Sequence, residues 1–307
     1  MLTRDELDRL ERLIVRFNYG AARSILLQAA RPCVSLFLDE IPADPQERAA
    51  RALALGASRM GGTPDLPGDF PWPILEDGFV IDDTRSEPGY AGFLLQLALA
   101  DMPRVADHPL PDAGYLYVFD CGPSQPFETS FLVSYSAAPA ADLRRAARPA
   151  GLLCAAEPAC FEDGESFAIR GTLGIDFPTS NADGMELYRL VAQATGVDDL
   201  AENAIETYAE FVRHALDADA EARATQGYPD WWWRVGRLFG AASPSQAGSP
   251  RGSADSDSSL SPLLVIESNP VVGYASPSDA APIQLLMPSA TERPWTRFDQ
   301  VVAALTR

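Results

Sequence analysis

Apolar residues recur at helical spacing at the start of the chain. Thr3 and Glu6 form a pattern typical of a capping box, and apolar residues then follow every three or four positions as far as Phe17. The same spacing recurs over 183–194 and, with an acidic outer side, over 198–223. These stretches predict three amphipathic helices.

Continuous apolar or aromatic runs predict β-strands in two similar pairs. One pair covers 90–99 and 114–120, the other 263–267 and 282–287. In each pair an Asp-Ala dipeptide precedes the second strand, which suggests an internal duplication. Further strands are predicted at 34–38, 130–135 and 152–155, and a short helix at 295–305. We expect an α+β fold with mixed, mainly antiparallel sheets and flanking helices.

Proline punctuates the segment over 61–73, which reads GGTPDLPGDFPWP. Four prolines in this short stretch fix the backbone repeatedly and leave few amides for a strand ladder. The segment is therefore predicted to be rigid and extended, with Phe70 and Trp72 as apolar anchors.

Composition suggests where the chain divides. Residues 1–58 are expected to form an N-terminal helical segment packed on a main domain over 59–307. Within that domain, 241–262 is rich in Ser, Ala, Pro, Gly and Asp, so too little apolar surface is available to order it. We predict a disordered loop there.

The charged residues narrow the possible chemistry and partners of the protein. The net charge is −19, and all 24 basic residues are arginine. The absence of lysine excludes Schiff-base chemistry, a pyridoxal phosphate anchor and a P-loop lysine. A strongly acidic protein repels nucleic acid and anionic lipid and attracts basic partners. We therefore expect a protein partner with a basic surface, no nucleic acid and no membrane.

Cysteine and histidine offer little chemistry. The four cysteines lack the spacing of a zinc site, and the two histidines, His108 and His214, lie in different predicted elements. Cys121 follows a predicted strand, where a nucleophile can sit, but a buried thiol is the simpler interpretation. The charged N-terminal stretch does not resemble a signal peptide, so we expect a cytoplasmic protein with reduced thiols. No cofactor is predicted.

Four short motifs follow the proline-rich segment along the chain. They are Phe93-Leu94-Leu95-Gln96-Leu97, Leu110-Pro111-x-x-Gly114-x-Leu116, Gly227-Tyr228-Pro229 and Leu263-Leu264-Val265-Ile266-Glu267. In this order, over 55–290, the segment and these motifs resemble the YwqG-like family, bacterial proteins known as a domain of unknown function, with the proline-rich segment as its opening signature. The chain departs from the family at Thr225, where a histidine is usual, and at Tyr274 and 279–281, where a WGD-x-G turn is usual. The resemblance implies a mixed α+β fold with an internal duplication and assigns no reaction.

Two groups of residues are candidates for binding. Trp231, Trp232 and Trp233 are consecutive, so they cannot all point the same way and at least one is expected to face outward. With Tyr228 and Arg234 they are typical of an interface or a ligand surface, although core packing is the simpler alternative. Gln96 interrupts an apolar strand, so its amide is expected to bond to backbone or to a ligand.

Acidic residues near the proline-rich segment are the candidates for metal binding. Asp65, Asp69 and Asp83 carry the oxygen ligands that divalent cations prefer. The alternative is an acidic loop in which Asp65 and Asp69 cap turns.

The charge and the tryptophan cluster favour a non-enzymatic binding protein for a cationic partner. Neutralisation of a toxin is one concrete version of this function. The alternatives are a carboxylate-based, metal-assisted enzyme at Asp65, Asp69 and Asp83, and a small-ligand receptor at the tryptophan cluster.

Overall fold

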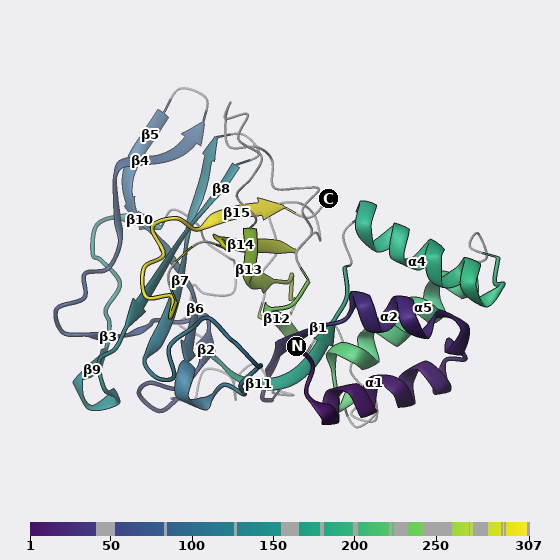
Figure 1. Ribbon diagram of the computed structural model, residues 1–307. Helices are drawn as coiled ribbons and strands as arrows, with labels where there is room; N and C mark the ends of the chain where they lie inside the picture. Colours follow the sequence, from purple (N-terminus) through teal and green to yellow (C-terminus); the bar gives the residue numbers. More distant parts are fainter. Residues whose placement is uncertain are drawn as a thin grey trace.

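The computed structural model describes residues 1–40, 53–82, 85–125, 128–154, 166–178, 181–198, 202–220, 223, 233–241, 260–269, 271–272, 282–289, 291 and 293–305. Its main sheet has ten strands. They are β1 (Arg31–Leu38), β2 (Arg59–Met60), β6 (Gly92–Ala98), β7 (Tyr115–Gln125), β8 (Glu128–Ser136), β11 (Phe167–Asp176), β12 (Arg234–Phe239), β13 (Leu260–Ile266), β14 (Ile283–Pro288) and β15 (Val302–Leu305). The order is β15-β14-β13-β12-β1-β11-β2-β6-β7-β8 (Figure 1).

Every neighbouring pair in this sheet is antiparallel. A three-stranded sheet has the order β10-β5-β4, formed by β10 (Leu153–Cys154), β5 (Arg85–Tyr90) and β4 (Ile74–Asp82). Its β10–β5 pair is parallel. A two-stranded sheet joins β3 (Asp65–Pro67) to β9 (Leu143–Arg145). The prediction of mixed, mainly antiparallel sheets is therefore confirmed.

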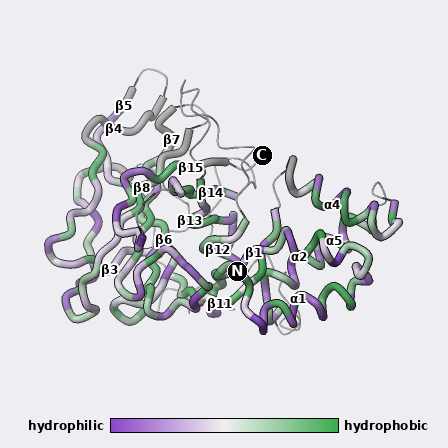
Figure 2. The backbone as a smooth tube through the Cα atoms, viewed as in Figure 1, coloured by the Kyte–Doolittle hydropathy of each residue, from purple (hydrophilic) through white to green (hydrophobic). Residues whose placement is uncertain are grey.

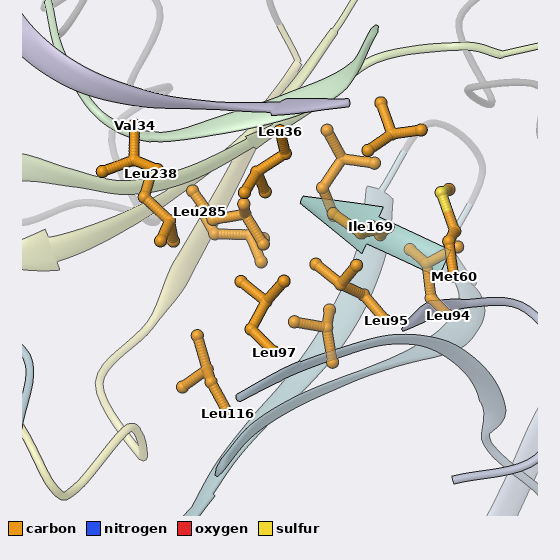
Figure 3. Close-up of a cluster of buried hydrophobic side chains, with 14 of the residues drawn as sticks. Val34, Leu36, Met60, Leu94, Leu95, Leu97, Leu116, Ile169, Leu238 and Leu285 are labelled. Atoms are coloured by element: carbon orange, nitrogen blue, oxygen red, sulfur yellow. The ribbon is translucent and has the colours of Figure 1, made fainter. Parts of the chain in front are cut away.

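The main sheet curls until its edge strands approach each other. β8 and β15 come within 8 Å between Cα atoms. One face of the sheet thus encloses an apolar core to which distant strands contribute, as Leu36, Leu97 and Leu285 do (Figure 3). Because side chains alternate along a strand, Leu116 of β7 joins the enclosed core while its neighbour Tyr117 faces outward.

The strand order is symmetric about the β1–β11 pair. β12, β13 and β14 follow outward from β1 as β2, β6 and β7 follow outward from β11. The two strand pairs with similar sequences, β6–β7 and β13–β14, hold matching places and are both antiparallel. This arrangement agrees with the internal duplication expected from the sequence.

A helical layer covers the outer face of the sheet at β1 and β11 (Figure 1). It consists of α1 (Arg4–Arg16), α2 (Arg23–Ala29), α4 (Asn181–Thr195) and α5 (Glu202–Leu216). Apolar and polar segments alternate along these helices, and their apolar sides enclose a second core with Cys33 and Ile175 of the sheet (Figure 2). The predicted capping box is present, because Glu6 N–H donates to Thr3 Oγ1 at 3.3 Å and Thr3 N–H donates to Glu6 Oε2 at 2.6 Å. None of the helices that the structure describes combines the length and apolarity needed to span a bilayer.

The 61–73 segment is the second cover of the outer face, at β6 and β7. Its Phe70 ring lies 5.5 Å from the Tyr117 ring and its Trp72 ring 5.9 Å from the Phe119 ring, between centroids. These rings belong to a third apolar cluster. Contrary to the prediction, the segment does form a short ladder, because residues of β3 pair with β9.

The N-terminal division predicted at residue 58 does not correspond to a division of the sheet. Residues 1–58 supply the helices α1 and α2 but also β1, which lies between β12 and β11 near the middle of the sheet. The predicted strand over 34–38 is thus confirmed, and the segment is a central part of the fold.

Three predicted boundaries need correction. The helix predicted over 295–305 is wrong, because Val302 to Leu305 form β15 and pair with β14; a short apolar run suits either element, and the neighbouring strand decides. The helix predicted over 198–223 ends at Leu216, where Asp217 Oδ1 accepts Asp219 N–H at 2.9 Å and starts a turn. The loop predicted over 241–262 overlaps β13 at its end, and 242–259 lie outside the described residues.

Candidate functional site

Gln96 and Asp65, two of the predicted site residues, are in direct contact. Gln96 lies on β6 and is fully buried. Its Oε1 accepts the Asp65 backbone N–H at 2.7 Å, and its Nε2 donates to the Ala57 carbonyl at 3.0 Å. The Tyr117 hydroxyl donates to the Asp65 carbonyl at 2.8 Å. Of the two alternatives predicted for Gln96, a backbone or a ligand partner, the structure shows backbone partners. These bonds tie the proline-rich segment to the sheet.

The Asp65 carboxylate is fully buried between two arginines. Its Oδ1 accepts Arg145 Nε–H at 2.5 Å, and its Oδ2 accepts Gly56 N–H at 2.8 Å and forms an ion pair with Arg59. Arg59 is also fully buried, and burial lowers its pKa to about 10 although Asp65 opposes the shift. Asp65 is therefore the counter-ion of a buried guanidinium, and removal of one partner would leave an uncompensated charge.

This geometry bears on the predicted metal site at Asp65, Asp69 and Asp83. Two guanidinium groups beside Asp65 repel a cation, and both carboxylate oxygens already accept N–H groups. Asp69 is exposed, and Asp83 lies outside the described residues. In the part of the chain that the structure describes, no group of three or more His, Cys, Asp or Glu residues could hold a metal ion. Nothing at Asp65 supports a metal site.

The tryptophan cluster is described only at its C-terminal end. Tyr228, Trp231 and Trp232 lie outside the described residues. Trp233 is buried in the core that the sheet encloses, and its carbonyl accepts Leu38 N–H at 2.7 Å. This tryptophan therefore has the core position that the sequence offered as the simpler alternative.

Arg234, at the start of β12, belongs to an internal network of ion pairs. Its Nε donates to Glu267 Oε2 at 2.6 Å, and Arg237 Nη1 donates to Glu267 Oε1 at 3.1 Å. Arg237 Nε in turn donates to the buried Asp176 Oδ2 at 2.9 Å. Burial alone would lower the pKa of Arg237, but Asp176 and Glu267 outweigh it and raise the pKa. Arg234 thus contributes to the stability of the fold.

The residues that complete these two networks were not predicted from the sequence. They are Arg59, Arg145, Asp176, Arg237 and Glu267. The available signal was a charged residue inside an apolar strand, as Arg237 is within β12, because such a residue needs a partner when it is buried. The identity of that partner depends on contacts between distant parts of the chain.

Asp120, in the middle of β7, is a buried carboxyl that differs from Asp65. Its side chain is 6% exposed, Oδ1 accepts Gly122 N–H at 2.8 Å, and it forms no ion pair with the residues that the structure describes. Burial raises the pKa of Asp120 to about 6, with the Gly122 hydrogen bond opposing the shift. A carboxyl with this pKa exchanges protons near neutral pH.

Cys121, the next residue, is a poor nucleophile. Burial raises the pKa of its thiol to about 11, and the charge of Asp120 adds to this shift. The thiol stays protonated at neutral pH, whereas nucleophilic attack requires the thiolate. Cys121 is half-buried within β7, and its protonated thiol favours a structural role over a nucleophilic one.

The curled antiparallel sheet with its two covers defines an α+β protein, and two networks of ion pairs lie within its fold. Residues 58–297 match the family described as Domain of unknown function (DUF1963), and the chain belongs to this family. A search of curated proteins and a search of solved structures found no match.

Proposed function

We propose that this protein is a non-enzymatic binding protein for a partner with a basic surface, and that within DUF1963 it belongs with the YwqG-like proteins. The observation that carries the proposal is the net charge of −19. A charge of this size accelerates encounter with cationic surfaces and prevents association with anionic ones. Neutralisation of a basic toxin in a bacterial cytoplasm is one form that this function takes.

The ion pairs within the fold support the proposal, because they engage arginines that would otherwise offset the acidic residues. Five arginines and four acidic residues form the half-buried and buried pairs. They are Arg59, Arg145, Arg223, Arg234 and Arg237 with Asp65, Asp176, Asp217 and Glu267. Taking these from the totals of 24 and 43 leaves 19 arginines against 39 acidic residues for the rest of the chain. The remainder thus carries about two acidic residues for each arginine.

Binding of a fluorescein-labelled oligo-arginine peptide, followed by anisotropy, tests this function. Measurements in about 0.01 M and about 1 M salt change the Debye length from about 30 Å to about 3 Å. We expect binding at low salt that is largely lost at high salt, and none for an uncharged Gly-Ser peptide of the same length. Absence of binding at low salt would contradict the proposal.

Asp120 favours a second candidate, an enzyme that uses a carboxyl as a general acid or base. Its burial and raised pKa suit that role. A screen of ester, amide and glycoside substrates with the native protein and Asp120→Asn tests it. Turnover that depends on Asp120 and follows a pKa near 6 would support the enzyme; turnover that survives the substitution would exclude Asp120 from the chemistry.

A small-ligand receptor at the tryptophan cluster stays a prediction. Quenching of tryptophan fluorescence by a panel of metabolites, lost in Trp231→Ala or Trp232→Ala, would identify it. If no metabolite changes the fluorescence, the hypothesis fails.

A further inference from the structure

Exposed large apolar side chains gather on the helical layer. Of the eleven such side chains in the described part of the chain, six lie on these helices or immediately after α4. They are Leu7, Val15, Met185, Leu190, Val197 and Ile205. A surface helix normally keeps its outer side polar, so this concentration marks the layer as a contact surface.

α4 carries the densest part of this surface. It packs mainly on α2, α5 and the 3₁₀ turn Gly20–Ala22, and Figure 1 shows it at the rim of the helical layer, away from the sheet. Met185 and Leu190 are each 40% exposed and Val197 is 44% exposed. Three exposed apolar side chains thus lie along one peripheral helix and its C-terminal end.

Helix geometry places Leu190 in an exposed stripe of α4. Glu186, Leu190 and Gln193 are separated by four and three residues, so they share a side of α4. All three are exposed, whereas Leu187 and Val191 are buried in the second core. At the C-terminal end, the N–H of Val197 donates to the Ala192 carbonyl at 3.0 Å and folds Val197 back on the helix. We call Glu186, Arg189, Leu190 and Gln193 the α4 outer face, and Val197 follows it at the C-terminal end.

The surroundings of this face are acidic. α4 and α5 together carry five carboxylates and two arginines. One of the arginines, Arg213, forms an ion pair with Glu210 at 3.4 Å. The other, Arg189, is exposed beside Leu190 and lies three residues from Glu186 on the same side of α4. Glu186 and Glu206 are exposed, and the C-terminal end of α4 adds the negative end of its dipole. Exposed apolar side chains with carboxylates around them are complementary to a partner helix whose apolar side is flanked by lysine or arginine.

We propose that the α4 outer face docks a basic amphipathic helix of a partner protein, with Leu190 as its apolar anchor. This inference rests on the proposed function and assigns it a surface. A second copy of the chain is the poorer occupant, because two acidic faces repel each other. An anionic membrane is excluded as an occupant for the same reason. Recognition of this kind lays the apolar side of a helix across a complementary surface.

A defined probe and a matched pair of variants test the proposal. The probe is a fluorescein-labelled amphipathic peptide of leucine and lysine, about 15 residues long so that it can fold as a helix. Leu190→Ser removes the anchor, and Leu132→Ser on β8 is its control, because the two side chains are 40% and 39% exposed. Urea midpoints of both variants show whether the fold is intact.

We expect Leu190→Ser to weaken peptide binding by about tenfold or more, and Leu132→Ser to leave it unchanged. Glu186→Gln is expected to weaken binding by a smaller factor and to reduce its dependence on salt. Salt-sensitive binding that is equal in all variants would overturn the α4 surface while the proposed function stands. Absence of binding at low salt would overturn both.

Discussion

The two covers of the outer face of the sheet are held by different forces. Over β1 and β11, the helices satisfy their own backbone and bury apolar side chains such as Leu10 and Phe211. Over β6 and β7, the proline-rich segment has few amides, and the side chains of Asp65, Gln96 and Tyr117 fix it to its surroundings. An extended cover rich in proline thus depends on side-chain hydrogen bonds. The helical cover is held mainly by its apolar side, with a few side-chain bonds such as Arg9 Nη1 to the Leu173 carbonyl at 3.1 Å.

The two covers also differ in whether their polar side chains are buried or face the solvent. Under the proline-rich cover, the side chains of Asp65 and Gln96 are buried and engaged in internal bonds. The helical cover keeps apolar and acidic side chains on its outer side, such as Leu190 and Glu186. We therefore assign a structural role to the first cover and partner binding to the second.

Asp65→Ala removes the buried counter-ion of the proline-rich cover and has the largest expected effect on stability. Arg59 would stay buried without its counter-ion, which lowers the free energy of unfolding by about 4 kcal/mol. Urea denaturation followed by tryptophan fluorescence measures the loss. Asp69→Ala, in the same segment but exposed, is the control and should change stability by no more than about 0.5 kcal/mol. Equal midpoints for both variants would show that the ion pair does not hold the cover.

Leu10→Ala weakens the packing of the helical cover. Leu10 is fully buried in α1, and the cavity left by its side chain should lower the free energy of unfolding by about 3 kcal/mol. Leu7→Ala on the same helix is the control, because Leu7 is 38% exposed and should lose less than about 1 kcal/mol. A similar loss for both would mean that the helical layer is not held by its buried side.

Asp120→Asn tests a buried carboxyl that, unlike Asp65, has no arginine partner among the residues that the structure describes. The folded pKa of about 6 lies above the ordinary value of 3.8, so protonation favours folding. The stability contributed by this proton is complete below about pH 4 and is lost as the pH rises through about 6. Asparagine removes the penalty, so stability should increase by up to about 3 kcal/mol at pH 7.5 and by about half as much at pH 5.

Urea denaturation of native protein and Asp120→Asn at both pH values measures this difference. Asparagine retains an acceptor for Gly122 N–H, so the comparison isolates the charge. A substitution that destabilises the protein at pH 7.5, or whose effect is independent of pH, would contradict the raised pKa.

Gln96→Ala tests the hydrogen bonds that hold the proline-rich cover and has a smaller effect on stability. The Asp65 N–H and the Ala57 carbonyl would lose their partner while they stay buried, at a cost of about 2 kcal/mol. Gln193→Ala is the control, because Gln193 is exposed on α4. If both variants unfold at the same urea concentration, Gln96 does not tie the segment to the sheet.

Local patterns predicted much of the fold. The capping box of α1, the helix α4 and the β6–β7 and β13–β14 pairs follow from spacing and apolar runs, which depend on nearby residues. β11 was not predicted, because Gly171 and Gly174 weaken its strand pattern. A Cβ on Gly174 would lie 2.6 Å from the Leu216 carbonyl, so the requirement for glycine comes from the close approach of α5. Sequence patterns do not show such tertiary contacts.

The candidate site was predicted only in part, for a similar reason. Gln96 and Asp65 are individually notable, because one interrupts an apolar strand and the other lies among prolines. Their contact with each other, and the pairing of Asp65 with Arg145, join residues 31 and 80 positions apart. Such pairings are fixed by the course of the whole chain, so they became visible only in the structure.

Hydrogen–deuterium exchange of the full protein, with and without the leucine–lysine peptide, tests the assignment of the two covers most directly. We expect slower exchange over 185–197 when the peptide is bound, and unchanged exchange over the 61–73 segment. Slower exchange confined to the 61–73 segment, or no change at α4 when the peptide is saturating, would contradict the assignment of partner binding to the helical cover.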